Sequence, residues 1–285
     1  MDTISIRPIG QVTAAVQDPG EMPPGGLEST IEVFAPYADA LLGIEENSHL
    51  WILGWFHKAS RKVLQTVPGR VNTDLPPYGV FALRSPTRPN PISLSLVQLQ
   101  GVEGRFLRVK GLDAVNGTPV LDIKPYFEND SIFSPDTPYI RAKTRDMRLH
   151  TLERLARSHH REECPDFHLA VRMGLIAEDC FGHLNSPGIR LWVRGPACLG
   201  DCLQGVSRAR LANPARFHFE ARSDCRESTW NLDRQWLTIS TRPGPFPERV
   251  DQTPDSELFE IHLSEEVGDQ TVFREPNLHG TGPEL

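Results

Sequence analysis

The first half of the chain contains no cysteine: Cys164, Cys180, Cys198, Cys202 and Cys225 all lie in the second half of the 285 residues. Five cysteines are too few for a disulfide-stabilised scaffold of this length. Their uneven distribution indicates two parts with different chemistry. An odd cysteine count, together with an N-terminus that lacks a basic segment followed by an apolar one, predicts a cytoplasmic protein with reduced thiols.

The sequence also lacks a long hydrophobic run and an excess of positive charge. The best apolar run, residues 50–56, is far shorter than the roughly 20 residues of a membrane helix, so no membrane association is expected. The net charge of -7 argues against a protein that coats nucleic acid without specificity. A hydrophobic fraction of 39% is enough for a packed core, and the length allows one large domain or two ordinary ones.

Short alternating or apolar runs separated by Gly and Pro are typical of an antiparallel barrel or sandwich. A short helix is predicted over residues 37–42. Strands are predicted at residues 4–6, 31–34, 50–53, 80–83, 92–96, 106–109 and 119–123.

The pattern changes to α+β near residue 138. Leu169, Met173 and Ile176 form one stripe of a predicted helix. Helices are predicted over residues 140–161, 167–181 and 199–211, and strands at 189–193, 216–221, 230–240 and 258–263. The predicted domains are residues 1–137, mainly β, and residues 138–265, α+β, followed by a loose tail over 266–285.

The most informative segment is GVFALRSPTRPNPISLSL, residues 79–96. Three prolines within six positions exclude strand or helix interior there, because each fixes φ and lacks an N–H group. The segment therefore predicts a stiff loop that holds Arg84, Arg88 and Asn90, which suits an anionic or nucleotide-like ligand. A proline-rich connector with exposed arginines explains the same residues.

These letters resemble the signature of the TsaA-like family, the tRNA methyltransferase O proteins, which reads approximately G-V-F-A-T-R-S-P-x-R-P-N-P-I-G-L-S. Leu83 and Ser93 stand where the family has Thr and Gly. Three further stretches match the family in order: IGQV at residues 9–12, GIEENSHLWILGWFHKA at 43–59 and GLDAVNGTPVLDIKPY at 111–126. The resemblance covers about residues 4–136. The stretch between His57 and Gly79 departs from the family's usual basic loop.

The resemblance implies a small antiparallel β-barrel that binds S-adenosylmethionine, forms a homodimer and methylates N6 of threonylcarbamoyl-adenosine in tRNA. The absence of a Gly-rich loop between a strand and a helix agrees with this, since it excludes the doubly wound methyltransferase site. Arg84 is expected to pair with the methionine carboxylate. The implied cofactor-binding residues are Met22, Pro23, Pro24, His57, Lys58, Arg84, Leu94, Leu112, Asp113, Asn116, Gly117, Thr118 and Pro119.

Arg88 and Asn90 are the predicted substrate-binding residues, and Asp122, Lys124 and Tyr126 the predicted catalytic residues. Structural explanations stand beside these roles, because Asn116-Gly117 is also a good hairpin turn and Asp122 can simply brace Lys124. Basic residues outnumber acidic ones between residues 57 and 110, which favours a tRNA partner but also fits a solvated strand face.

In the second half, residues 164–174, CPDFHLAVRMG, resemble part of a subunit family of formylmethanofuran dehydrogenase, as does the spacing of Cys198, Asp201 and Gln204. This implies that His160, Cys164 and Cys198 are metal ligands, suited to zinc. Glu162 replaces the family's second histidine, and buried cysteines without a metal are the structural alternative.

A methyltransferase acting on tRNA is the leading hypothesis. Two alternatives remain: a module that senses S-adenosylmethionine while the second domain handles a metal, and an enzyme that methylates a small molecule.

Overall fold

The computed structural model describes residues 4–23, 25–244, 247, 249–267 and 270–274. The chain divides into two compact units, residues 1–132 and 133–285. The first is a closed antiparallel barrel and the second combines helices with one mixed sheet, so the predicted fold classes are confirmed. The division between the units falls a few residues before the predicted domain boundary.

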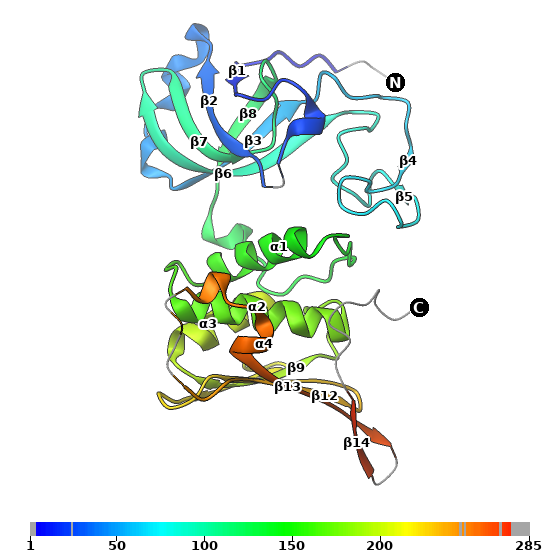
Figure 1. Cartoon of the computed structure of the whole chain (residues 1–285). Coiled ribbons are helices and arrows are strands. Elements are labelled where there is room, and N and C mark those ends of the chain that lie inside the picture. The colour runs from blue at the N-terminus through cyan, green and yellow to red at the C-terminus, as the bar shows by residue number, and fades with distance from the viewer. Residues whose placement is uncertain (1–3, 24, 245–246, 248, 268–269, 275–285) are drawn as a thin grey trace. The chain divides into compact units, whose positions relative to one another are not determined.

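Six strands form the barrel of the first unit, and each neighbouring pair is antiparallel (Figure 1). In pairing order they are β1 (Gly10–Thr13), β2 (Leu27–Val33), β7 (Phe106–Leu112), β6 (Ile92–Glu103), β3 (His49–Trp55) and β8 (Pro119–Pro125). The barrel closes where Gly10 of β1 pairs with Val120 of β8. The connections contain η1 (Pro19–Glu21), η2 (Ala35–Leu41), η3 (Ile44–Glu46), η4 (Glu128–Asp130) and a small sheet of β4 (Gln65–Thr66) and β5 (Tyr78–Gly79).

The barrel interior is apolar along most of its length and lined by hydroxyl groups where β6 begins. Leu50 and Ile52 of β3 point into the core. On β6 the alternation places Ser93 and Ser95 inside, whereas Leu94, on the other face, is 49% exposed. Gly54, paired with Ser93, makes room for the serine, because a Cβ at Gly54 would lie 2.7 Å from the Ser93 hydroxyl.

Three predicted strands of the chain differ from the structure. Residues 4–6 precede β1 and are exposed, and residues 80–83 form turns after β5. The predicted strand over residues 230–240 is a hairpin, because the Asn231 side chain donates hydrogen bonds to the carbonyl oxygens of Asp233 and Gln235 and so fixes a turn. The predicted helix over residues 37–42 is the 3-10 helix η2.

The second unit packs its longer helices on one face of a six-stranded sheet (Figure 1). Leu169, Met173 and Ile176 are fully buried in its core, as their spacing predicts. The helices are α1 (Arg145–Arg157), α2 (Pro165–Phe181), α3 (Ala197–Ser207), η5 (Val250–Gln252) and α4 (Asp255–Leu258). In sheet order the strands are β10 (Phe217–Ala221), β9 (Arg190–Gly195), β11 (Glu227–Leu232), β12 (Gln235–Thr241), β13 (Phe259–Val267) and β14 (Gln270–Arg274).

The end of the chain is more regular than predicted. Residues 266–285 are expected to form a loose tail, yet β13 extends to Val267 and β14 pairs with it, Leu263 opposite Arg274. The loose-tail prediction is therefore wrong for residues 266, 267 and 270–274, because they pair in the ladder of β13 and β14. Residues 275–285 lie outside the described part of the chain.

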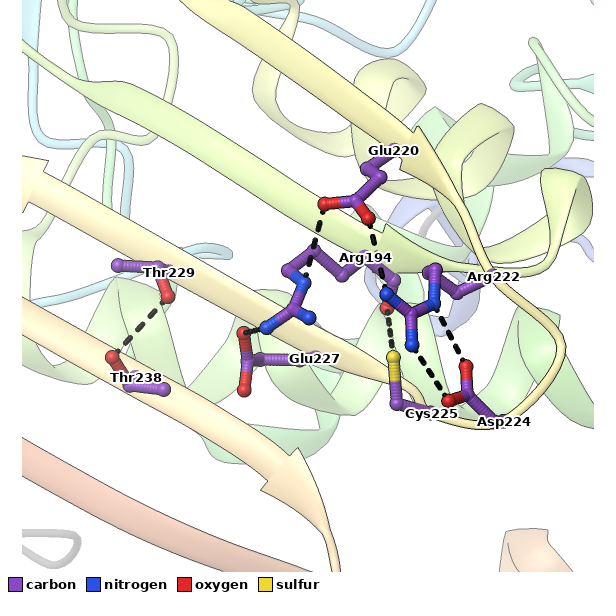
Figure 2. A network of polar contacts seen from close by, with 8 residues as sticks. All are labelled: Arg194, Glu220, Arg222, Asp224, Cys225, Glu227, Thr229 and Thr238. Carbon is purple, nitrogen blue, oxygen red and sulfur yellow. Dashed lines mark hydrogen bonds and ion pairs between the residues drawn. The ribbon is translucent and has the colours of Figure 1, made fainter.

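An ion-pair network covers the β9, β10 and β11 side of this sheet (Figure 2). Arg194 lies between Glu220 and Glu227, at 3.4 Å from each, and Arg222 holds Asp224 through two hydrogen bonds of 2.9 and 2.7 Å. These groups are largely exposed, so we assign the network a modest role in stability. The half-buried Cys225 thiol lies 3.8 Å from the Arg194 carbonyl oxygen.

Candidate functional site

The predicted cofactor residues gather at one end of the barrel, which we call the loop end. Trp55, the last residue of β3, pairs with Ile92, the first of β6. Leu27, the first of β2, pairs with Leu112, the last of β7. Because neighbouring strands run antiparallel, the loops that follow β1, β3 and β7 and those that precede β2, β6 and β8 all lie at this end. Segments far apart in the sequence thus border one site.

The loop between β1 and β2 is fastened to the loop end by two cationic side chains. Lys58 Nζ donates to the Gln17 carbonyl oxygen at 2.6 Å, and Arg70 donates to the carbonyl oxygen of Met22. Gly26 has a φ of 75° and packs against β7, where a Cβ would lie 2.6 Å from the Leu112 carbonyl carbon. These contacts bring Met22 and Leu112 to one side of the site. Pro23 is half-buried in the same loop, and Pro24 lies outside the described residues.

The turn before β8, residues 116–118, also borders the loop end. The Asn116 side-chain oxygen accepts from the Ala14 N–H at 3.2 Å, and Gly117, at φ 78°, donates its N–H to the Val12 carbonyl oxygen at 2.8 Å. Pro119 follows as the first residue of β8. Thr118 is 1% exposed, and its hydroxyl has no hydrogen-bond partner within the described residues. One buried hydroxyl therefore remains available here.

The proline-rich loop is organised from inside by Arg88. Its Nη2 donates to the Val80 carbonyl oxygen at 2.8 Å and also to that of Leu83, and its Nε donates to the Ser85 carbonyl oxygen at 2.8 Å. These carbonyl groups accept hydrogen bonds from a guanidinium and not from a neighbouring strand, which explains why residues 80–83 form turns. Arg88 thus makes its hydrogen bonds within its own loop. The expectation that Arg88 binds substrate stays a prediction.

Several side chains at the loop end are exposed, so a ligand can reach them. Arg84 and Asn90 project from the loop that Arg88 organises, while His57 and Asp113 follow β3 and β7, and all four are exposed. Leu94 stands outside the barrel on β6. Exposed cationic, amide and carboxylate groups around a rigid rim can recognise a polar, charged small molecule.

The predicted catalytic residues lie along β8, away from the loop end. Asp122 and Lys124 form an exposed ion pair of 2.8 Å. The Tyr126 N–H donates to the carbonyl oxygen of His49, the first residue of β3, so Tyr126 lies at the opposite end of the barrel. At about 3.3 Å per residue along β8, it is roughly 25 Å from the turn before β8. Within one chain, the structure does not bring Tyr126 to the predicted cofactor residues.

The predicted metal ligands of the second unit do come together. The donor atoms of His160, Cys164 and Cys198 all lie within 4.8 Å of one another. Cys164 precedes α2 and makes no capping hydrogen bond through its side chain, while Cys198 lies in the first turn of α3. Burial, followed by the neighbouring Cys164, raises the pKa of the Cys198 thiol.

Sequence reasoning named Asp201 only for its spacing from Cys198 and missed the contacts that Asp201 makes in this cluster. Asp201 accepts a hydrogen bond from His160 Nδ1 at 2.9 Å and lies 3.2 Å from His159 Nε2. Cys202 is buried nearby, and burial raises the pKa of its thiol far above the ordinary range. The spacing of Asp201 three residues after Cys198, one helical turn, was the signal that could have indicated it.

Within the part of the chain that the structure describes, no helix has both the length and the apolar character needed to cross a membrane.

Similarity to known proteins agrees with the barrel's motifs. The family model of the tRNA-methyltransferase O N-terminal domain matches residues 18–131. A probable S-adenosyl-L-methionine-binding protein of Methanothermobacter thermautotrophicus is 45% identical over 130 residues, which cover 44% of this chain and 92% of that protein. The chain belongs to the tRNA-methyltransferase O family.

Two further relatives differ in how much of the chain they share. A probable S-adenosyl-L-methionine-binding protein of Archaeoglobus fulgidus is 37% identical over 232 residues, covering 77% of this chain and 62% of that protein. This alignment is longer than the barrel unit, so the likeness continues into the second unit. The human tRNA (adenine(37)-N6)-methyltransferase is 47% identical over 95 residues, which cover 32% of this chain and 21% of that protein.

Proposed function

We propose that the protein is an S-adenosylmethionine-dependent methyltransferase that modifies N6 of threonylcarbamoyl-adenosine in tRNA. The observation that carries the proposal is the gathering of motif residues from four separate segments at the loop end of one barrel. The names of the relatives, which include S-adenosyl-L-methionine-binding proteins and a tRNA (adenine(37)-N6)-methyltransferase, support it.

In the proposed cofactor site, Arg84 pairs with the methionine carboxylate, because its guanidinium is exposed on a loop that Arg88 keeps rigid. The loop around Met22 and the turn at Asn116, which is hydrogen-bonded to the start of that loop, both border the site, and the buried Thr118 hydroxyl supplies a hydrogen bond. Arg88 and Asn90 border the acceptor side. The other members of the site are Pro23, Pro24, His57, Lys58, Leu94, Leu112, Asp113, Gly117 and Pro119.

The proposed partner in solution is a second copy of the chain. Outward-facing apolar side chains pair across β3 and β6: Trp51 with Leu96, Leu53 with Leu94, and Trp55 with Ile92. The three β6 residues are 37–49% exposed, and this apolar face is typical of an interface. We infer that the face is covered in a homodimer.

The homodimer also gives a role to the catalytic candidates on β8. Asp122 pairs with Leu53 and Lys124 with Trp51, so both border the apolar face. In the proposed dimer they act on the cofactor end of the partner. Asp122 accepts the proton that leaves N6 of adenosine, Lys124 holds its carboxylate in place, and Tyr126 packs against the acceptor base. The cofactor supplies the methyl group.

The proposed acceptor is a tRNA, in the cytoplasm. Basic side chains of residues 58–88, in the connection between β3 and β6, flank the loop end and can attract the phosphate backbone. All five cysteines are free thiols, which agrees with a reducing compartment.

For the second unit we propose a bound zinc ion. Two thiols and an imidazole within 4.8 Å of one another suit this ion, whose tetrahedral bonds of about 2.0–2.3 Å place ligand atoms about 3.3–3.8 Å apart. A small closure of the cluster therefore brings the three donor atoms to zinc-binding distances.

The second candidate function is methylation of a small molecule, or sensing of S-adenosylmethionine. It is favoured by the net charge of -7 and by the departure of residues 58–78 from the family's basic loop.

The test uses S-adenosylmethionine carrying a labelled methyl group and two tRNAs, one with threonylcarbamoyl-adenosine and one with unmodified adenosine at the same position. Calorimetric titration first establishes cofactor binding. We expect label transfer to the modified tRNA alone. Cofactor binding without transfer to either tRNA would favour the second candidate, and no cofactor binding would refute both.

A further inference from the structure

The cluster of His160, Cys164 and Cys198 is one ligand short of a closed zinc site. Within the described residues, these three are the donors that come within 4.8 Å of one another. Structural zinc sites take four protein ligands, whereas sites with three protein ligands keep the fourth position for water or for a bound molecule. The number of donors therefore points to the second kind of site.

Solvent reaches the cluster. All three donor residues are half-buried, and Pro165 and Ala197, which follow Cys164 and precede Cys198 in the chain, are exposed. An ion held by the three side chains would have one side open to water. A ligand can thus reach the fourth position without opening the apolar core behind α2 and α3.

The surrounding backbone favours a negatively charged ligand. Cys164 directly precedes α2 and Cys198 lies in the first turn of α3, so two helix N-termini meet at the cluster. The partial positive charge of a helix N-terminus favours a bound anion. A zinc ion with two thiolates and one neutral imidazole carries no net charge, so a further anion meets no excess negative charge on the ion.

Asp201 fixes the imidazole for metal binding. It occupies His160 Nδ1 at 2.9 Å, which leaves Nε2 facing the Cys164 sulfur at 3.7 Å. Its other oxygen lies 3.2 Å from His159 Nε2, which restrains the carboxylate. A carboxylate on the far nitrogen of a metal-binding histidine selects the tautomer and orients the ring.

We propose that the second unit contains an open zinc site, in which Asp201 positions His160 and an exogenous anionic ligand, a carboxylate or thiolate, takes the fourth position. The inference rests on the proposed zinc site, and it is independent of cofactor binding by the barrel.

The test uses the full chain loaded with Co²⁺ in place of zinc, after elemental analysis has established the stoichiometry. We expect one metal ion per chain and the visible absorption of a four-coordinate ion with sulfur ligands. Titration with azide and, separately, with mercaptoacetate should then shift the visible bands and saturate. One bound ion with bands that neither anion changes would refute the open position alone. No bound ion, or a disulfide found by thiol counting, would refute the zinc site itself.

Substitutions test which residues bind the metal ion. Cys164→Ser and Cys198→Ser should each lower metal stoichiometry well below one per chain, whereas Cys225→Ser, outside the cluster beside Arg194, should leave it unchanged (Figure 2). Asp201→Asn should keep one ion but bind it about 10–100-fold more weakly, with an unchanged melting temperature of the metal-free protein. Unchanged affinity in Asp201→Asn would overturn its positioning role.

Discussion

Arg88 Nη2 donates a hydrogen bond to the Val80 carbonyl oxygen at 2.8 Å, joining the middle of the segment that carries the family motif to its start. The same guanidinium also binds the carbonyl oxygens of Leu83 and Ser85. The proline-rich loop is therefore held in one conformation by its own arginine, and Arg84 is exposed on this loop.

The first prediction tests this relationship. Arg88→Lys keeps the charge but loses the planar group that reaches several carbonyl oxygens at once. With hydrogen bonds to charged groups worth about 1.5–3 kcal/mol, we expect S-adenosylmethionine to bind about tenfold more weakly by calorimetry. Arg108→Lys, an exposed arginine on β7, is the control and should bind normally. Equal affinities in both variants would contradict the role of Arg88.

The second prediction concerns the contact between the β1–β2 loop and β7. Gly26→Ala places a Cβ 2.6 Å from the Leu112 backbone and so displaces the loop that carries Met22. We expect weaker cofactor binding and a loss of about 1–3 kcal/mol in unfolding free energy.

The matched control for that substitution is Gly43→Ala. Gly43 has a φ of 78°, close to the 75° of Gly26, but no atom lies within 4 Å of a Cβ there. It shares the backbone strain without the collision. If Gly26→Ala and Gly43→Ala affect cofactor binding alike, the packing of the loop on β7 is not what positions it.

The third prediction concerns the apolar face of β3 and β6. Leu94→Glu places a charge at its centre and should convert the proposed dimer to monomers in sedimentation velocity. Leu42→Glu is the control: Leu42 is 95% exposed and lies between η2 and η3, outside strands β3 and β6, so the dimer should persist. A wild-type protein that sediments as a monomer at all concentrations would rule out the homodimer.

The fourth prediction concerns the pH dependence of stability in the second unit. Burial lowers the pKa of His183, whose ring stacks on Tyr139 at 5.1 Å. The folded state favours the neutral imidazole of His183 over the charged one. The stability that the neutral imidazole contributes is therefore complete above the unfolded pKa of about 6.5, and it is lost as the pH falls through the folded pKa. Unfolding free energy should therefore decrease less between pH 7 and pH 5 in His183→Gln than in the wild type. The exposed His262→Gln should follow the wild type.

The motif residues singled out in the sequence gather at one end of the barrel, whereas the faces of the strands were not predicted. The order of the motifs located the loop-end residues, since their separate segments are joined by the closure of the barrel. Alternation in ISLSL predicted a strand but not that Ser93 would face inward, because that depends on Gly54 across the sheet. Likewise, the apolar residues at positions 80–83 predicted a strand, but Arg88 donates hydrogen bonds to the carbonyl groups there. Local patterns do not contain such long-range partners.

The same limit applies to the second unit. The cysteines and His160 could be proposed as ligands from the sequence alone, but the carboxylate that contacts the histidine lies on helix α3. Asp201 and His160 are 41 positions apart and meet only because α3 packs beside the start of α2. The separation of Tyr126 from the loop end also required the strand register, in which the N–H group of Tyr126 donates to His49.

Nucleoside mass spectrometry tests the central claim most directly. The purified chain is incubated with S-adenosylmethionine carrying a trideuterated methyl group and with tRNA containing threonylcarbamoyl-adenosine, and the tRNA is then digested to nucleosides. We predict that the modified adenosine gains one labelled methyl group on N6, and that Arg88→Lys reduces the yield. Bound cofactor with an unlabelled nucleoside pool would contradict the proposed function.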